Sequence, residues 1–223
     1  MRHNLLRVRR VAVLLLALVL GGLTVAVTPP APAEAERPWV YITFDDGPHS
    51  KYTGQVLDIL SQYGARATFF QLGRNIQSYP WLTRRAHLRG NSIQNHTWNH
   101  PDLRYVSWDS FKWQVQATDR YIRAQTGYTP RCLRPPYGGV NSTVYSRASA
   151  LGKKIRLWTV DPRDWSRPGT SVIASRVLNN VRSGSIVLLH DGGGDRSQTV
   201  AALPTILKTL KSRGYEFRRV WCY

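Results

Sequence analysis

Strand-like and helix-like segments alternate along most of this 223-residue chain, and this alternation limits its fold more than any other feature. Short apolar runs such as 39–42 and 185–190 are typical of strands, whereas segments such as 53–63 carry apolar residues at helical spacing. Strands that alternate with helices of ten or more residues imply parallel β/α construction. The pattern therefore predicts an α/β fold.

The expected strands cover 39–42, 67–72, 92–95, 132–134, 155–160, 185–190 and 216–220. The expected helices cover 53–63, 80–89, 108–125, 141–151, 171–181 and 199–213. About seven or eight strands in one domain favour a closed or nearly closed barrel. An open doubly wound sheet is the alternative, although no phosphate-binding glycine fingerprint follows the first strand.

Residues 1–35 have the pattern of a secretory signal peptide. Four arginines precede the apolar run Val11–Val27, and small residues follow, so we expect cleavage after Ala33 or Ala35. The alternative is an uncleaved membrane anchor, because the apolar run is nearly long enough to span a bilayer.

No repeat or linker divides residues 36–223. We expect this part to be one secreted, monomeric catalytic domain, associated with the cell wall, that reaches the membrane only if the segment stays uncleaved.

The chain is strongly basic, with a formal net charge of +18. Residues 1–35 hold four arginines and one glutamate, which leaves +15 on the remainder. Such a charge attracts polyanions. No nucleic-acid-binding module is recognisable, so we expect an anionic wall polymer or an acidic polysaccharide as partner and no nucleic acid. The alternative is that the charge only keeps the protein soluble.

Two cysteines, Cys132 and Cys222, remain in the expected exported domain. A disulfide between them would connect the C-terminal end to the middle of the domain, and an exported protein can keep such a bond. Two free thiols are the alternative.

Adjacent carboxylates, Asp45 and Asp46, follow the first expected strand. Buried carboxylates side by side repel each other and lose hydration, and a metal ion would relieve that cost. Gly47 and Pro48 then turn the chain, which leaves both acids at the carboxyl end of the strand. An ordinary Asp-Asp-Gly-Pro turn is the alternative.

Other polar residues also follow expected strands. They are His96 and His100 after the third strand, Arg134 at the end of the fourth, Asp164 after the fifth, and His190 with Asp191 at the end of the sixth. Because the carboxyl ends of parallel barrel strands share one face, we expect these side chains to meet in one active site. Glycines 192–194 follow, which suggests a flexible or closely approached rim or else a simple turn.

The pair His96 and His100 predicts a metal site. Histidines four residues apart lie on one side of a helical turn and can chelate one ion. With Asp46 they would give three protein ligands and an open position, which is a catalytic zinc arrangement. The same ligand set also serves non-haem iron oxygenases. Asp45 beside the ion favours hydrolysis, because it could take a proton from water.

Five segments in order resemble the motifs of the polysaccharide deacetylases, the NodB-like carbohydrate esterases. They are TFDDGP at 43–48, NHTWNHPDL at 95–103, LRPPYG at 133–138, DPRDW at 161–165 and IVLLHD at 186–191. The resemblance extends over most of residues 36–223 and implies a distorted (β/α) barrel.

The resemblance also implies a role for each motif residue. Asp46, His96 and His100 would bind a divalent metal, zinc first, with Co²⁺ or another divalent ion as the alternative. Asp45 would be the general base on metal-bound water, held by Arg134 through a bidentate pair.

On the leaving-group side, the resemblance implies that His190 is the general acid and that Asp164 orients its ring. The backbone N–H of Tyr137 would help to stabilise the oxyanion. Trp165 and Leu188 would form the walls of the acetyl pocket.

These roles together predict a secreted, metal-dependent polysaccharide deacetylase that hydrolyses N-acetyl groups of GlcNAc-containing glycans, either peptidoglycan or chitin oligomers, to free amine and acetate. One alternative is an acetylxylan O-esterase of the same family. The other is a non-catalytic carbohydrate-binding homologue, and the presence of Asp45, Asp46, both histidines, Arg134 and His190 argues against it.

Overall fold

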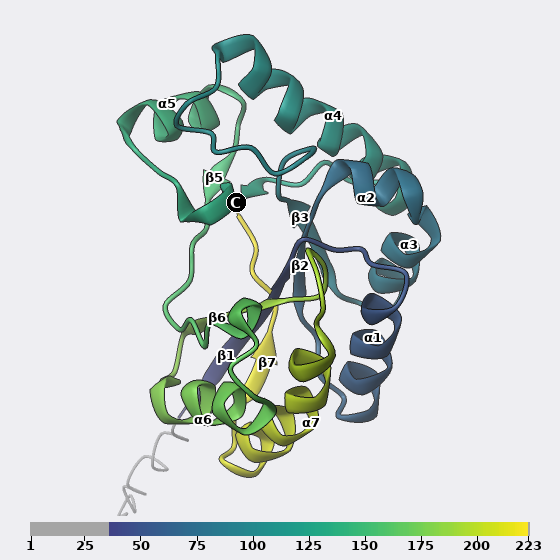
Figure 1. Cartoon of the computed structure of the whole chain (residues 1–223), viewed down its shortest axis with the longest axis vertical. Coiled ribbons are helices and arrows are strands. Elements are labelled where there is room, and N and C mark those ends of the chain that lie inside the picture. The colour runs from purple at the N-terminus through teal and green to yellow at the C-terminus, as the bar shows by residue number, and fades with distance from the viewer. Residues whose placement is uncertain (1–35, 223) are drawn as a thin grey trace, which may run out of the picture. The chain divides into compact units, whose positions relative to one another are not determined.

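Strand β1 (Trp39–Asp45) pairs with three other strands in the computed structural model, which describes residues 36–222 (Figure 1). On one side it pairs in parallel with β6 (Ser185–His190). On the other side its carboxyl end pairs with β2 (Thr68–Gln71) and its amino end with β7 (Glu216–Arg218). The expected signal peptide, residues 1–35, lies outside the described residues.

From β2 the sheet continues through β3 (Ser92–Asn95), β4 (Cys132–Leu133) and β5 (Lys154–Ile155). The strand order is β5-β4-β3-β2-β1-β6, with β7 beside β1, and every pair is parallel. The predicted α/β fold with a distorted (β/α) barrel is confirmed, and the barrel is incompletely closed. In the residues described, the strands number seven.

The strand expected over 155–160 is divided in the structure. Ile155 still pairs with β4, but the next backbone bridge is Val160 with Val187 of β6, at the opposite edge of the sheet. Between them, the carbonyls of Arg156 and Leu157 accept hydrogen bonds from the Arg134 guanidinium instead of from a strand. The segment therefore crosses the gap between the two sheet edges and nearly closes the barrel.

Seven α-helices are described, and they pack outside the sheet (Figure 1): α1 (Tyr52–Gln62), α2 (Gly73–Ser78), α3 (Pro80–Leu88), α4 (Trp108–Thr126), α5 (Ser142–Ala150), α6 (Thr170–Asn180) and α7 (Ser197–Ser212). The Ser107 side chain accepts from the Ser110 N–H at the start of α4, and Gly127 ends this helix with φ 79°. The sequence pattern did not predict the short α2. No helix between residues 36 and 222 is both long and apolar enough to cross a membrane.

The core lies between the sheet and the helices. Buried apolar side chains of β1 and β6 pack against α1, α6 and α7, and this cluster contains the fully buried Ile42, Phe44, Leu57, Leu189 and Leu207. Cys132 of β4 is bonded to Cys222 in a disulfide that attaches the C-terminal segment to the sheet. The core between the sheet and the helices is therefore apolar, and the disulfide fixes the C-terminal segment to the sheet. The polar residues of the predicted site lie at the carboxyl ends of the strands.

Candidate active site

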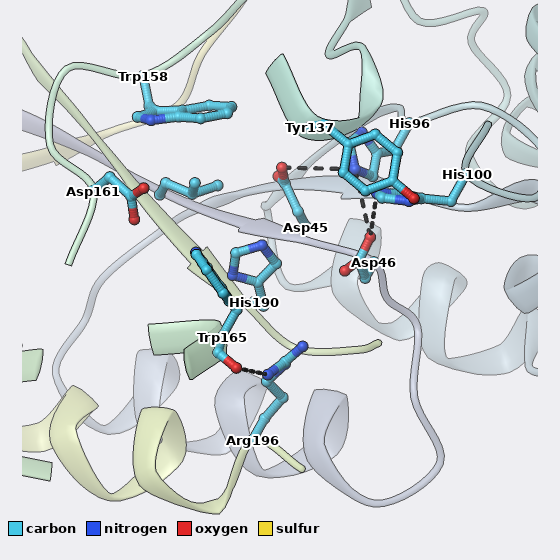
Figure 2. A pocket seen from close by; sticks show the side chains of 11 residues that line it. Asp45, Asp46, His96, His100, Tyr137, Trp158, Asp161, Trp165, His190 and Arg196 are labelled. Atoms are coloured by element: carbon cyan, nitrogen blue, oxygen red, sulfur yellow. Dashed lines mark hydrogen bonds and ion pairs between the residues drawn. The ribbon is translucent and has the colours of Figure 1, made fainter. Parts of the chain in front are cut away.

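A cavity of about 430 Å³ opens at the carboxyl ends of the strands (Figure 2). Its lining residues are Asp45, Asp46, His96, His100, Tyr137, Trp158, Asp161, Trp165, Leu188, His190 and Arg196. In the view of Figure 2 the histidine pair and Tyr137 lie on one side, Trp158 and Asp161 on the other, and Asp45 and His190 between them. Arg134 and Asp164 lie behind this lining and contact it.

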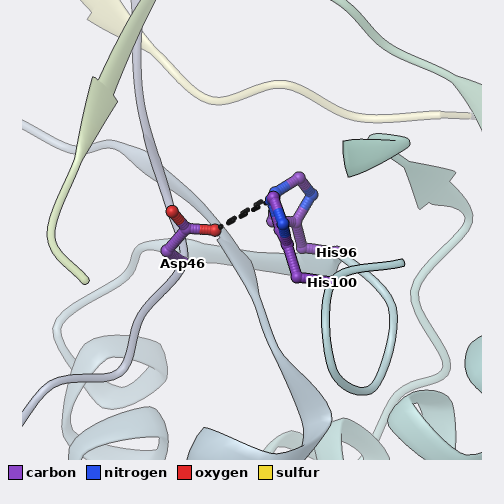
Figure 3. Close-up of side chains that lie close together, drawn as sticks. All are labelled: Asp46, His96 and His100. Atoms are coloured by element: carbon purple, nitrogen blue, oxygen red, sulfur yellow. Dashed lines mark ion pairs between the residues drawn. The ribbon is translucent and has the colours of Figure 1, made fainter. Parts of the chain in front are cut away.

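Asp46, His96 and His100 form the candidate metal centre (Figure 3). Asp46 Oδ1 lies 3.4 Å from His96 Nε2 and 3.3 Å from His100 Nε2. One ligand atom from each residue can be chosen so that all three lie within 4.8 Å of one another. This separation allows one small cation to contact all three.

The donor set fits a cation. His96 Nδ1 lies 2.6 Å from the Arg134 carbonyl oxygen, which can only accept, so Nδ1 carries a proton. Burial alone lowers the pKa of His96, but the charge of Asp45 and the contact with Asp46 raise it, so Nε2 presents a lone pair only once it has given up its own proton. That lone pair faces Asp46 Oδ1, a buried atom without a hydrogen-bond donor among the residues described. A cation between these two atoms, either a proton on Nε2 or a metal ion that replaces it, would satisfy both.

Burial and neighbouring charges shift the pKa values of Asp46 and His100. Burial alone raises the pKa of Asp46, but contact with His96 and the charges of His96, His190 and His100 lower it far below its usual range. Burial together with the charge of His96 lowers the pKa of His100 to about 4, against the attraction of Asp46 and Asp45. His100 is therefore neutral at neutral pH, as a metal ligand must be.

The two histidines do not lie on a helical turn, contrary to the sequence prediction. Residues 96–100 form a loop in which Thr97 and His100 have positive φ values of 72° and 69°. Side-chain oxygens accept from the backbone N–H groups of this loop, as carbonyl oxygens would in a helix. Asn95 Oδ1 accepts from the Thr97 N–H, and Gln114 Oε1 accepts from the N–H groups of Trp98 and Asn99. The loop brings both Nε2 atoms to Asp46 all the same.

Asp45 is held from behind by Arg134. The guanidinium is completely buried, and its Nη1 lies 2.7 Å from Asp45 Oδ1 and 2.8 Å from the Thr43 hydroxyl. The predicted bidentate pair is wrong, because Nε and Nη2 donate to the Arg156 and Leu157 carbonyls. Arg134 thus fixes one carboxylate oxygen of Asp45 and leaves the other, 3.7 Å from His96 Nε2, toward the metal centre.

His190 forms a buried pair with Asp164. Its Nδ1 lies 2.7 Å from Asp164 Oδ1, and its backbone N–H donates to Asp164 Oδ2 at 2.8 Å. Burial alone lowers the pKa of His190, but the hydrogen bond and charge of Asp164, with further help from Asp45 and Asp46, raise it to about 9. At neutral pH the ring is therefore protonated, with Nε2 available at the cavity.

The predicted substrate residues also meet here. Tyr137, Trp165 and Leu188 line the cavity, and the Tyr137 ring contacts the edge of His100 at 4.5 Å between centroids. Tyr137 has φ 60°, within the segment Pro136–Gly138. Tyr137 and Trp165 are 69% and 48% exposed, so both side chains are accessible to a molecule that enters the cavity.

Three further lining residues were not predicted: Trp158, Asp161 and Arg196. Asp161 stands in the DPRDW motif, and that position could have marked it. Trp158 and Arg196 have no comparable signal, since each lies outside the five motifs.

The glycines after Asp191 form a closely approached rim. A Cβ on Gly192 would lie 2.2 Å from the Asp46 carbonyl oxygen, and a Cβ on Gly193 would lie 2.5 Å from Asp46 Oδ2. Asp191 itself is buried against Gly47, and burial raises its pKa to about 7. The loop therefore packs directly on the metal-centre carboxylate and leaves no room for a side chain.

Comparison with known proteins identifies the family. Residues 33–155 match the polysaccharide deacetylase family. A peptidoglycan-N-acetylglucosamine deacetylase of Bacillus cereus is 44% identical over 180 residues, which cover 80% of this chain and 84% of that protein. The chain belongs to the polysaccharide deacetylase family. It is accordingly a hydrolase of the polysaccharide N-deacetylase class, with a polysaccharide substrate.

Two further members of the family are also close to this chain. A chitooligosaccharide deacetylase of Azorhizobium caulinodans is 37% identical over 188 residues, which cover 79% of this chain and 90% of that protein. The structure of the peptidoglycan deacetylase PdaC from Bacillus subtilis superposes with a TM-score of 0.77 and 36% identity, over 83% of this chain and 89% of that one. The shared barrel agrees with the fold described above.

Proposed function

We propose that this polysaccharide deacetylase is secreted, depends on a divalent metal, and removes N-acetyl groups from GlcNAc-containing glycans, either peptidoglycan or chitin oligomers. The observation that carries the proposal is one cavity with two distinct proton-handling groups. Asp45, held by Arg134, stands beside the Asp46 and histidine cluster, and His190, protonated and paired with Asp164, is in register with Asp45 on the neighbouring strand. The names of two relatives, which specify N-acetylglucosamine and chitooligosaccharides, support this substrate class.

Asp46, His96 and His100 would hold the metal, and their oxygen and two nitrogens suit zinc, with Co²⁺ as an alternative. A bound divalent ion supplies positive charge for the acetyl carbonyl oxygen and lowers the pKa of water toward ~7. The protein's part is to hold these three side chains at fixed positions. The hydrogen bond from His96 to the Arg134 carbonyl contributes by fixing the ring.

Asp45 acts as the general base in this proposal. Water attacks the acetyl carbonyl carbon and gives a proton to the Asp45 carboxylate, whose other oxygen is held by Arg134. The buried guanidinium prevents the carboxylate from rotating away and balances its charge. The Tyr137 N–H would help to stabilise the developing oxyanion.

His190 acts as the general acid. Its Nδ1 is bound to Asp164, so Nε2 donates the proton to the sugar nitrogen as the carbon–nitrogen bond breaks. The products are a free amine and acetate. Leu188 and Trp165 would enclose the acetyl methyl group.

The test is acetate release by residues 36–223 from chitin oligomers, peptidoglycan and acetylxylan, with and without chelator. We expect chelator-sensitive release from at least one N-acetylated glycan. Release from acetylxylan alone would replace the proposal by an O-esterase, and no release from any of the three would overturn it. Unchanged release by Asp45→Asn would overturn only the role of Asp45.

Export of the enzyme is also part of the proposal. It rests on the basic and apolar pattern of residues 1–35 and on the Cys132–Cys222 disulfide, a bond that persists in oxidising compartments. N-terminal sequencing of the full chain after expression in a bacterial host tests it. A start at Glu34 or Glu36 in the medium is expected, and intact Met1 in the membrane fraction would instead indicate an anchor.

A further inference from the structure

The start of α7 and the residue before it contact the loop that carries Asp164. The Thr199 hydroxyl donates to Asp164 Oδ2 at 2.8 Å, and Gln198 Oε1 accepts from the Gly169 N–H at 2.7 Å. Arg196 Nη1 donates to the Trp165 carbonyl at 3.4 Å (Figure 2). Three side chains from one helical end therefore hold one loop, and none of the proposed catalytic roles uses them.

Thr199 is the contact that reaches the catalytic pair. Both Thr199 and Asp164 are only 1% exposed, so water does not replace this hydrogen bond. Asp164 Oδ1 is occupied by the His190 ring, and Oδ2 by the His190 N–H and the Thr199 hydroxyl. Among the residues described, Thr199 is the one donor to the Asp164 carboxylate that does not belong to His190. It thus connects the carboxylate to α7.

The carboxylate needs such a connection because its terminal torsion has a broad energy minimum. With Thr199 present, the Asp164 carboxylate accepts from His190 on β6 and from Thr199 on α7, and these two elements together fix the plane of the carboxylate. Without the hydroxyl, both remaining bonds go to His190, and the pair can tilt together. A tilt of the ring would move Nε2 away from the leaving nitrogen, and general acid catalysis depends strongly on that geometry.

We propose that Thr199 is a positioning residue for deacetylation, acting through Asp164 to keep His190 Nε2 directed at the leaving nitrogen. The inference rests on the proposed function, because it presupposes His190 as the acid. Its consequence is selective: substrates with poor leaving groups, such as the amide of an N-acetyl sugar, need Thr199. Esters with good leaving groups need it far less, because a phenolate can leave without a proton.

The test is Thr199→Val, which removes the hydroxyl and keeps the shape. On chitin oligomers kcat should fall about tenfold to hundredfold, as expected when a hydrogen bond to a charged group is lost, with KM changed less than about twofold. On 4-nitrophenyl acetate the loss should stay below about threefold. Thr199→Ser restores the hydroxyl and should recover most of the chitin-oligomer activity.

The matched control is Thr118→Val in α4. Thr118 is also fully buried and donates to a helix carbonyl, that of Gln114, so its loss measures the effect of removing a buried hydroxyl elsewhere. We expect wild-type kinetics from it. Thermal unfolding of every variant reports folding, and Thr199→Ala replaces Thr199→Val if the valine variant does not fold.

Two outcomes would overturn the inference. One is wild-type kcat on chitin oligomers for Thr199→Val, and the other is an equal loss on both substrates without rescue by serine. The proposed function fails separately, if the wild-type enzyme itself releases no acetate from any N-acetylated glycan.

Discussion

Asp45 and Asp46 are neighbours in the chain with different environments. Asp46 has a left-handed φ of 70° and faces two imidazoles, whereas Asp45 is in ion-pair contact with the fully buried Arg134. The backbone turn between them points the two carboxylates at different partners. Burying two adjacent carboxylates is unfavourable, and each one has its own partner: Asp46 faces the candidate cation site, and Asp45 is paired with the Arg134 guanidinium.

Asp45→Asn should lower kcat by about 10²–10⁴-fold, because the amide keeps the shape but cannot accept the proton. Metal binding should persist, since Asp46, His96 and His100 are unchanged. Steady-state kinetics with metal analysis of the same sample checks both parts. A variant within a factor of ten of wild-type activity would contradict the role of Asp45.

The raised pKa of His190, about 9, predicts an alkaline limit to kcat. The acid must be protonated, and this form predominates below the pKa and is lost as the pH rises through it. We therefore expect kcat to fall above about pH 9. Asp164→Asn removes the charge that supports the protonated ring and should move this limit toward lower pH. A pH profile of both proteins gives the answer, and identical limits would contradict the pairing.

At the scale of single elements, the loop between β6 and α7 is built around glycine. Gly193 has φ +69°, and a Cβ there would meet Asp46 Oδ2 at 2.5 Å. Gly214 has φ +81° with no atom within 4 Å of such a Cβ. A residue with a Cβ would be strained by the positive φ at either position, but only at position 193 would its Cβ meet Asp46.

Gly193→Ala should therefore weaken metal affinity by at least about tenfold, because the methyl group displaces the Asp46 carboxylate. Gly214→Ala should cost only the left-handed strain, ~1–2 kcal/mol, without effect on affinity. Calorimetric titration with zinc and thermal unfolding separate the two effects. Equal metal affinities would show that the rim does not support Asp46.

Most elements could be predicted from the sequence because local apolar spacing reflects which face is buried. Besides the unpredicted α2, two expected elements were wrong, the helical turn at 96–100 and the continuous strand at 155–160, and these two have one physical cause. Distant side chains, Gln114 in the first case and Arg134 in the second, take backbone hydrogen bonds that regular structure would have used. Such contacts leave no periodic signal. Thr199 was missed similarly, because nothing near it in sequence marks its contact with Asp164.

At the scale of the whole molecule, the disulfide closes a large part of the chain. Cys132 and Cys222 are 90 residues apart, and in the chain-entropy description a loop of that size is worth roughly 4–5 kcal/mol. The bond would act mainly on the unfolded state. Asp45 on β1 and His190 on β6 lie outside the cluster that the two cysteines form with Phe70 and Val220.

The double variant Cys132→Ala/Cys222→Ala should accordingly lose up to roughly 4 kcal/mol of unfolding free energy, with kcat nearly unchanged at a temperature where it stays folded. Urea unfolding measures the loss, and reduced wild-type protein is the control. A loss below about 1 kcal/mol would mean that the bond contributes little to stability.

We propose that Asp46, His96 and His100 hold the ion on which deacetylation depends. The most direct measurement is titration of metal-free protein with zinc while acetate release from chitin oligomers is recorded. Activity should rise linearly and saturate at one equivalent of zinc, and His100→Ala should neither bind at that affinity nor recover. Full activity in the metal-free protein, or one-equivalent recovery by His100→Ala, would contradict the claim.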